Sequence, residues 1–83
     1  MDRKEILRRV ITVVAEVLNL PEEDIAEDSA FIADLGAESI QSLELVAAFE
    51  EEFDIEMDED AALKVQTISD AVDCITRYVQ QEK

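Results

Sequence analysis

Ser39 and Ser42 are the side chains in this sequence that most resemble a reactive site, because they follow its only glycine, Gly36. A serine hydroxyl becomes a nucleophile in an enzyme when a nearby base, usually histidine, removes its proton. This sequence contains no histidine, so we predict no catalytic residue and no enzyme activity of its own. Two interpretations of Ser39 remain: it is an ordinary helix cap, or another protein modifies it.

A calcium site in the acidic run after Phe53 is the metal-binding alternative. Asp54, Glu56 and Asp58 fall at the first, third and fifth positions of a calcium-binding loop. The sixth position would then be Glu59, where glycine is required, and the twelfth would be Val65, where glutamate is required. We therefore predict no specific metal site.

Charge and composition limit the classes of protein to which this sequence can belong. Its 83 residues predict one domain over 1–83, and 48% hydrophobic residues predict a folded core. The net charge is -15, with no Lys or Arg from 10 to 63, which disfavours nucleic acid and anionic membranes as partners. The single cysteine, Cys74, is expected to be a partly buried structural thiol. No signal peptide or membrane span is recognisable, so we expect a cytoplasmic protein, or one delivered elsewhere after removal of a segment outside this sequence. We also expect a monomer.

Apolar periodicity predicts an all-α fold, with main helices over 3–18 and 39–53 and a last helix that begins at Thr67. A short helix is expected near 59–63. The long loop over 19–38 should be pinned to the core by its apolar side chains, which are Ile25, Phe31, Ile32 and Leu35. Ser39 is the expected N-cap of the second helix. The predicted architecture is an antiparallel four-helix bundle of three main helices and one short helix.

The run DLGAESIQSLELVAAFEEEF from 34 to 53 resembles the acyl carrier protein family. The signature of that family is a D-L-G-A/G-D-S-L run, followed by an acidic and apolar helix that ends in E-E-E-F. Asp34, Leu35, Gly36 and Ala37 match directly, and Ser39 falls on the serine that carries 4'-phosphopantetheine in the family. The resemblance extends over essentially the whole chain.

The resemblance implies a carrier that holds acyl groups as thioesters on a 4'-phosphopantetheine arm attached to Ser39. A phosphopantetheinyl transferase would transfer this arm from coenzyme A and would supply the base and the metal. The carrier would then serve enzymes of fatty-acid or related lipid or polyketide biosynthesis. In this interpretation Gly36 allows a close approach of the turn.

The resemblance also suggests which residues contact partners and cargo. Acidic side chains would dock against basic patches on partner enzymes; they are Asp34, Glu38, Glu44, Glu50, Glu51 and Glu56. Apolar side chains would surround an acyl chain between the helices; they are Phe31, Leu43, Val46, Phe49, Met57, Ala62, Val65 and Ile68.

Glu38 and Ile40 depart from the family pattern, which has aspartate before the serine and leucine after it. These departures favour a specialised carrier. Two alternatives stay open: a peptidyl or D-alanyl carrier that uses the same serine, and an acidic protein-interaction module without a prosthetic group.

Overall fold

Helices form nearly all of the regular structure in the computed structural model, which describes residues 2–58, 60, 62 and 64–81. The helices are α1 (Arg3–Leu18), α2 (Ser39–Phe53) and α4 (Ile68–Gln81), with a 3-10 turn, η1, at Glu22–Asp24. Within the described residues the only strand-like pairing is an isolated bridge between Ala30 and Thr67. None of the helices in these ranges has the length and apolar character that a membrane span requires. The predicted all-α class is confirmed.

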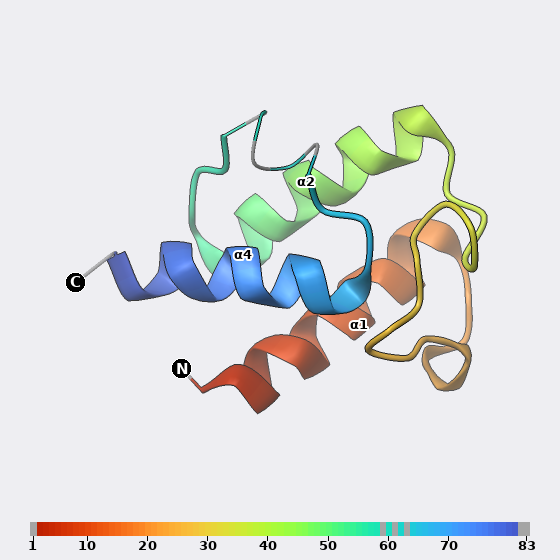
Figure 1. Cartoon of the computed structure of the whole chain (residues 1–83), viewed down its shortest axis with the longest axis horizontal. Helices are drawn as coiled ribbons and strands as arrows, with labels where there is room; N and C mark the ends of the chain where they lie inside the picture. The colour runs from red at the N-terminus through yellow and green to blue at the C-terminus, as the bar shows by residue number, and fades with distance from the viewer. Residues whose placement is uncertain (1, 59, 61, 63, 82–83) are drawn as a thin grey trace.

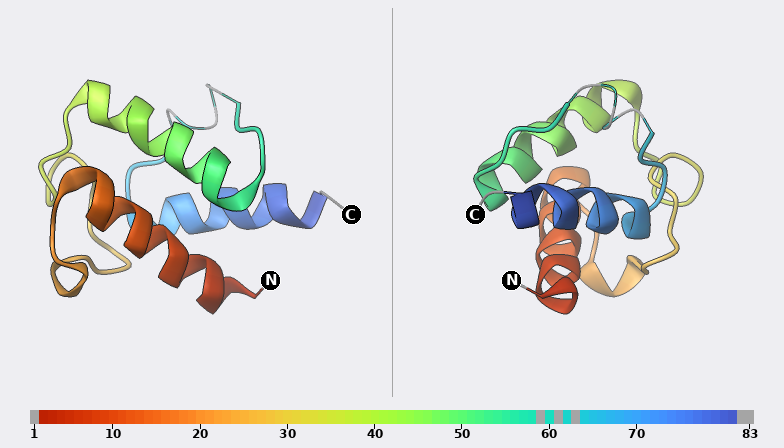
Figure 2. Two further views of the ribbon diagram at one scale, coloured as in Figure 1. Left: turned by 180° about the vertical axis from the view of Figure 1, so that it is seen from behind. Right: turned by 60° about the vertical axis from the view of Figure 1, so that its left-hand side comes forward.

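The three helices surround one core, with α1 in contact with both of the others (Figure 1). α1 runs in the opposite direction to α2 and α4, and α2 and α4 make few direct contacts with each other (Figure 2). α2 and α4 both begin at the end of the molecule where α1 stops, so the connection after α2 returns the chain to that end (Figure 1). The structure is therefore the expected helical bundle, with a gap between α2 and α4 that other segments must fill.

Local hydrogen bonds mark the helix ends where the sequence predicted them. The Asp2 carboxylate accepts from the backbone N–H of Glu5 at 2.9 Å, and Asn19 ends α1 in the left-handed conformation with φ 57°. At the start of α4, Asp70 N–H donates to the Thr67 hydroxyl at 3.1 Å, and the Asp70 carboxylate accepts from Thr67 N–H at 3.3 Å. This is a reciprocal capping box, as the T-x-x-D pattern predicted.

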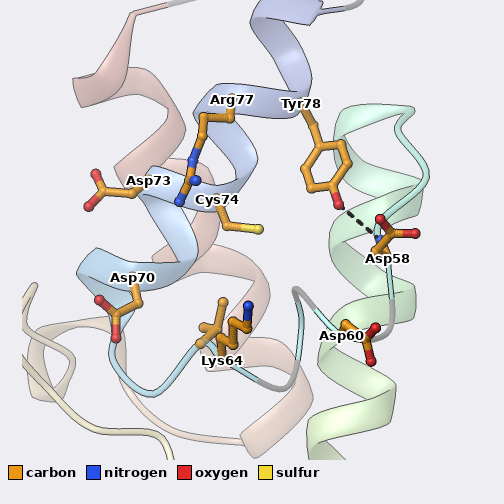
Figure 3. A pocket seen from close by; sticks show the side chains of 9 residues that line it. Asp58, Asp60, Lys64, Asp70, Asp73, Cys74, Arg77 and Tyr78 are labelled. Atoms are coloured by element: carbon orange, nitrogen blue, oxygen red, sulfur yellow. Dashed lines mark hydrogen bonds between the residues drawn. The ribbon is translucent and has the colours of Figure 1, made fainter.

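The connection from α2 to α4 is held by side chains of both helices. The Glu50 carboxylate accepts from Met57 N–H at 2.9 Å, and the Tyr78 hydroxyl accepts from Asp58 N–H at 3.0 Å (Figure 3). The short helix predicted near 59–63 falls mainly outside the described residues. Of its members, Asp60 and Ala62 are helical, and Ala62 N–H donates to the Asp58 carbonyl at 3.0 Å.

Backbone hydrogen bonds fasten the loop over 19–38 to the segment that leads into α4. Phe31 N–H donates to Gln66 at 2.9 Å, Ile68 N–H to Ser29 at 3.0 Å, and Ser69 N–H to Glu27 at 2.8 Å, in each case to the carbonyl oxygen. These bonds satisfy backbone groups that no helix or sheet would satisfy. The loop is long, but these hydrogen bonds hold it from Glu27 to Phe31 against the segment that leads into α4.

The apolar side chains of this loop are placed differently from one another. Ile25 and Phe31 are buried and Leu35 is half-buried, as predicted. Ile32 is 67% exposed, so the prediction that it pins the loop to the core is wrong. Ile32 lies in a turn in which Gly36 N–H donates to its carbonyl, and this turn directs the side chain of Ile32 away from the core that Phe31 enters.

Arg3 joins the start of α1 to the loop and to α4. Its guanidinium lies 2.7 Å from the Glu27 carboxylate and 3.1 Å from the Asp73 carboxylate, and it donates to the Ser69 hydroxyl at 3.2 Å. All three charged side chains are largely exposed, so these pairs orient the segments more than they stabilise them.

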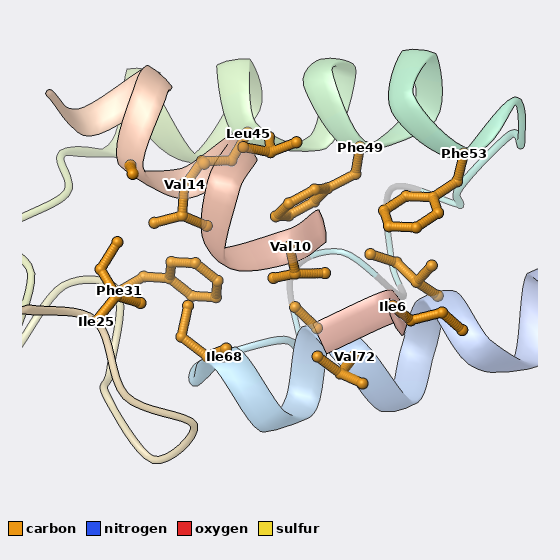
Figure 4. Packing of buried hydrophobic residues seen from close by; sticks show 14 of the residues in the cluster. Ile6, Val10, Val14, Ile25, Phe31, Leu45, Phe49, Phe53, Ile68 and Val72 are labelled. Carbon is orange, nitrogen blue, oxygen red and sulfur yellow. The ribbon is translucent and has the colours of Figure 1, made fainter. Parts of the chain in front are cut away.

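The core lies where the three helices meet (Figure 4). Leu45, Phe49 and Phe53 of α2 point toward Val10 and Ile6 of α1. The largest side chains that are fully buried come from α1 and α4; they are Ile6, Val10, Val14, Ile68, Val72 and Ile75. Burial of each such side chain contributes about 1.5–3 kcal/mol, which makes this apolar contact the main source of stability.

Ile75→Val should therefore destabilise the fold through the loss of one buried methyl group. Ile75 is fully buried, and this substitution typically costs about 1 kcal/mol. The matched control is Ile40→Val, because Ile40 is 66% exposed and should change stability by less than about 0.5 kcal/mol. Urea unfolding followed by circular dichroism measures both, and equal losses would contradict this core.

Cys74 provides a second test, because it is a free cysteine that is only 7% exposed. Burial raises the pKa of the thiol, and the nearby Arg77 opposes this only in part. The thiolate is thus scarcer in the folded chain. Stability that is present below the ordinary thiol pKa is therefore lost as the pH rises from that value through the raised pKa of the folded thiol. Alkylation by iodoacetamide at pH 8 should be at least about tenfold slower in the folded protein than in urea. Equal rates would show that the thiol is open to solvent.

Candidate functional site

Ser39 is the first residue of α2. The preceding residue, Glu38, is the N-cap, with an extended backbone at φ -92° and ψ 167°. The Glu38 carbonyl accepts the first helical hydrogen bond, from Ser42 N–H at 3.0 Å. The prediction that Ser39 is the cap is therefore wrong by one position, because the chain has already become helical at Ser39.

Gln41 supplies a capping interaction that the sequence analysis missed. Its side-chain oxygen accepts from the backbone N–H of Glu38 at 2.9 Å. This is the arrangement in which the third helical residue reaches back to the N-cap. The E-x-x-Q pattern at 38–41 could have revealed it, since glutamine is one of the residues preferred at that position.

Gly36 gives the turn before Ser39 its shape. Its φ of 72° lies in the left-handed region, which other residues rarely adopt. A side-chain carbon placed there would meet no atom within 4 Å. Glycine is therefore needed there for its backbone conformation. That Gly36 also allows a close approach of the turn to the attached group stays a prediction.

The turn is closed on both sides of Gly36. The Asp34 carboxylate accepts from Ala30 N–H at 2.8 Å, and Ala37 N–H donates to the Phe31 carbonyl at 2.8 Å. Ala37 is also buried at 4% exposure. Ser39 therefore follows a short segment whose backbone is fixed from Ala30 onward.

The helix terminus determines the electrostatics at Ser39. The N-terminus of a 15-residue helix such as α2 carries a partial positive charge and presents N–H groups to an anion. A phosphate bound at Ser39 would be favoured by this terminus and opposed by the exposed carboxylate of Glu38. The arrangement can accept an anionic group on the first helical residue.

An apolar groove with a volume of about 460 Å³ begins beside the first turns of α2. It lies in the gap between α2 and α4, and the loop and the connection supply its other walls. Its lining is Ala30, Phe31, Ile32, Ala33, Ser42, Leu43, Leu45, Val46, Phe49, Met57, Ala62, Val65, Gln66 and Ala71. Every predicted pocket residue except Ile68 is among them. Ile68 is fully buried in the core instead.

Three large apolar side chains are exposed around the start of α2. Ile32 is 67% exposed, Ile40 66% and Leu43 61%. Ile32 and Leu43 line the groove, whereas Ile40 directly follows Ser39. Ile32 was expected to face the core and Ile40 was given no contact role, because the apolar character of a residue does not show whether its side chain faces solvent.

The predicted docking acids differ in exposure and in the hydrogen bonds that they accept within the fold. Glu38, Glu44, Glu51 and Glu56 are exposed, and so is Asp34. Glu50 is half-buried and its carboxylate accepts from Met57 N–H, so this residue has a structural role whether or not it contacts partners. Asp34 likewise closes the turn described above.

A second hollow, of about 540 Å³, lies against α4 and has a polar lining (Figure 3). Charged side chains such as Asp70, Asp73 and Arg77 surround it, and the described residues that line it include none from α2. Among the described residues, no group of three or more acidic or cysteine side chains is arranged to hold a metal. The groove beside α2 is thus the hollow that adjoins the helix carrying Ser39.

Comparison with known proteins identifies the family. A family model described as the phosphopantetheine attachment site matches residues 8–75. The chain is 53% identical to an acyl carrier protein of Caulobacter vibrioides over 72 residues, which are 87% of this chain and 92% of that protein. It is 51% identical to an acyl carrier protein of Phenylobacterium zucineum over 77 residues, which are 93% of this chain and 92% of that protein. The chain belongs to the acyl carrier protein family, whose members carry a phosphopantetheine attachment site.

Proposed function

We propose that Ser39 is the residue to which 4'-phosphopantetheine is attached, and that the chain carries acyl groups for fatty-acid or related lipid or polyketide biosynthesis. The observation that carries this proposal is the position of Ser39 in a chain of this family: it is the first residue of α2, the helix whose following turns line the groove. The arm supplies a thiol on which acyl groups are held as thioesters.

Attachment is a transfer of a phosphoryl-linked group to the Ser39 hydroxyl. The hydroxyl oxygen forms a bond to the phosphorus of coenzyme A that bears the pantetheine arm, and the bond from that phosphorus to the nucleotide half breaks. The hydroxyl proton goes to a base of the transferase. The chain itself has no histidine, and this mechanism explains why it needs none: Ser39 is a substrate, and the chain is not itself a catalyst.

The groove is the proposed site for the acyl chain. Its walls are mainly apolar, with Phe31, Val46 and Phe49 among them, so an acyl chain would be shielded there from water. The few direct contacts between α2 and α4 support this role, because widening the groove would break little of the packing on α1.

The exposed acids of α2 are the proposed docking surface. Glu44 and Glu51 are two turns apart, so they lie on one face of the helix. A basic patch on a transferase or on an acyl-processing enzyme would be attracted to this face, which raises the association rate more than the affinity. This suits a monomer that moves between several enzymes, and we place it in the cytoplasm, with neither nucleic acid nor membrane as its partner.

Modification of Ser39 is tested by incubating the protein with coenzyme A, Mg²⁺ and a broad-specificity phosphopantetheinyl transferase. Intact mass spectrometry should show the gain of one arm in the unchanged protein and in Ser42→Ala, which is the matched control one turn further along α2. Ser39→Ala should gain none. If the unchanged protein gained no arm with several transferases, it would be the acidic interaction module instead.

Docking is tested by reversing two charges on α2. The double variant Glu44→Lys with Glu51→Lys should lower kcat/KM for modification by about tenfold at low salt, because it replaces attraction by repulsion. The matched control is Glu16→Lys with Glu23→Lys, which changes the net charge equally on exposed positions outside α2. The difference between the double variants should shrink in 0.5 M NaCl. Equal rates for both at low salt would exclude this docking surface.

A further inference from the structure

The start of α2 is held by a set of hydrogen bonds that all converge on Glu38. Its N–H donates to the Gln41 side-chain oxygen at 2.9 Å. Its carbonyl accepts from Ser42 N–H at 3.0 Å and from the Ser42 hydroxyl at 3.4 Å. Both backbone groups of the residue before Ser39 are therefore fixed by the first turn of the same helix.

Of these bonds, the one to Gln41 is the shorter of the two that involve a side chain, and it is the one that satisfies the N–H of Glu38. Ser42 N–H would bond to Glu38 in any helix that begins here, whereas the acceptor on Gln41 depends on the residue type. The Glu38 side chain accepts from the backbone N–H of Gln41 in return, so the two residues form a reciprocal capping box. Gln41 is the member of this box that holds the N–H of Glu38.

The absence of charge on Gln41 has a further consequence. Glutamate would accept the same hydrogen bond, since both residues serve at this position of a capping box. Glutamate would also add a second carboxylate, beside Glu38, in the first turn where the new phosphate must lie. Glutamine fixes the backbone without this repulsion.

We propose that Gln41 is a positioning residue for the modification of Ser39, because it fixes the Glu38 backbone and so orients the first residue of α2 toward the transferase. This inference rests on the proposed attachment at Ser39. Gln41 does not take part in the chemistry; it increases the fraction of molecules in which Ser39 is presented correctly.

Gln41→Leu tests this role, because leucine has a similar size and a good helix propensity but has no acceptor. The loss of a capping interaction shifts the equilibrium between the ordered and the frayed helix terminus by about fivefold. We expect hydrogen exchange at Glu38 N–H to become about fivefold faster, and kcat for modification to fall about fivefold. KM should change little, because the proposed docking residues, Glu44 and Glu51, lie further along the helix and are unchanged in this variant.

Two variants separate positioning from a general loss of stability. Gln80→Leu is the matched control; it makes the same change at an exposed position of α4 and should leave exchange and kcat unchanged. Gln41→Glu should restore the protection of Glu38 N–H fully and kcat only in part, with the remaining deficit reduced at high salt.

Failure of the positioning role can be distinguished from failure of the proposed attachment at Ser39. If the unchanged protein is not modified at all, the attachment at Ser39 fails. If it is modified and Gln41→Leu exposes Glu38 N–H without lowering kcat, the positioning role is overturned. Unchanged exchange at Glu38 in Gln41→Leu would also overturn it, because the side-chain bond would then not fix the terminus.

Discussion

The packing of both α2 and α4 on α1 is the constraint on which the rest of this structure depends. α1 buries an apolar face against both helices, while α2 and α4 make few contacts with each other. A three-helix arrangement of this kind leaves a gap on the side away from α1. The loop over 19–38 and the connection after α2 line that gap, and the apolar groove forms where they do so incompletely.

The same constraint places Ser39. The loop is fastened to the segment before α4 by backbone hydrogen bonds at Glu27, Ser29 and Phe31. From Phe31 the chain turns through Gly36 and enters α2, and the helix lines the groove from Ser42 onward. The fold thus joins an anion-favouring position to an apolar cavity.

Much of this could be predicted from the sequence, since the helix spans follow from strongly periodic apolar residues and the caps from local patterns such as T-x-x-D. The wrong expectation about Ile32 concerns the direction of a side chain. The sequence marks Ile32 as apolar, but only the tertiary fold turns it toward solvent. The hydrogen bonds between the loop and the segment before α4 join residues that lie far apart in the sequence. No local sequence pattern predicts such bonds. The N-cap is Glu38 and not the predicted Ser39. Glu38 forms a capping box with Gln41, whose side chain accepts from the Glu38 N–H.

The central claim is that this chain is a substrate which presents Ser39 to another protein for modification. The most direct measurement is fragmentation mass spectrometry of the peptide that spans 34–53, taken from protein produced in its own cells. The account predicts a phosphopantetheine arm on Ser39, with the Ser42 hydroxyl unmodified. An arm on Ser42, or a peptide that carries no arm under any growth condition, would contradict it.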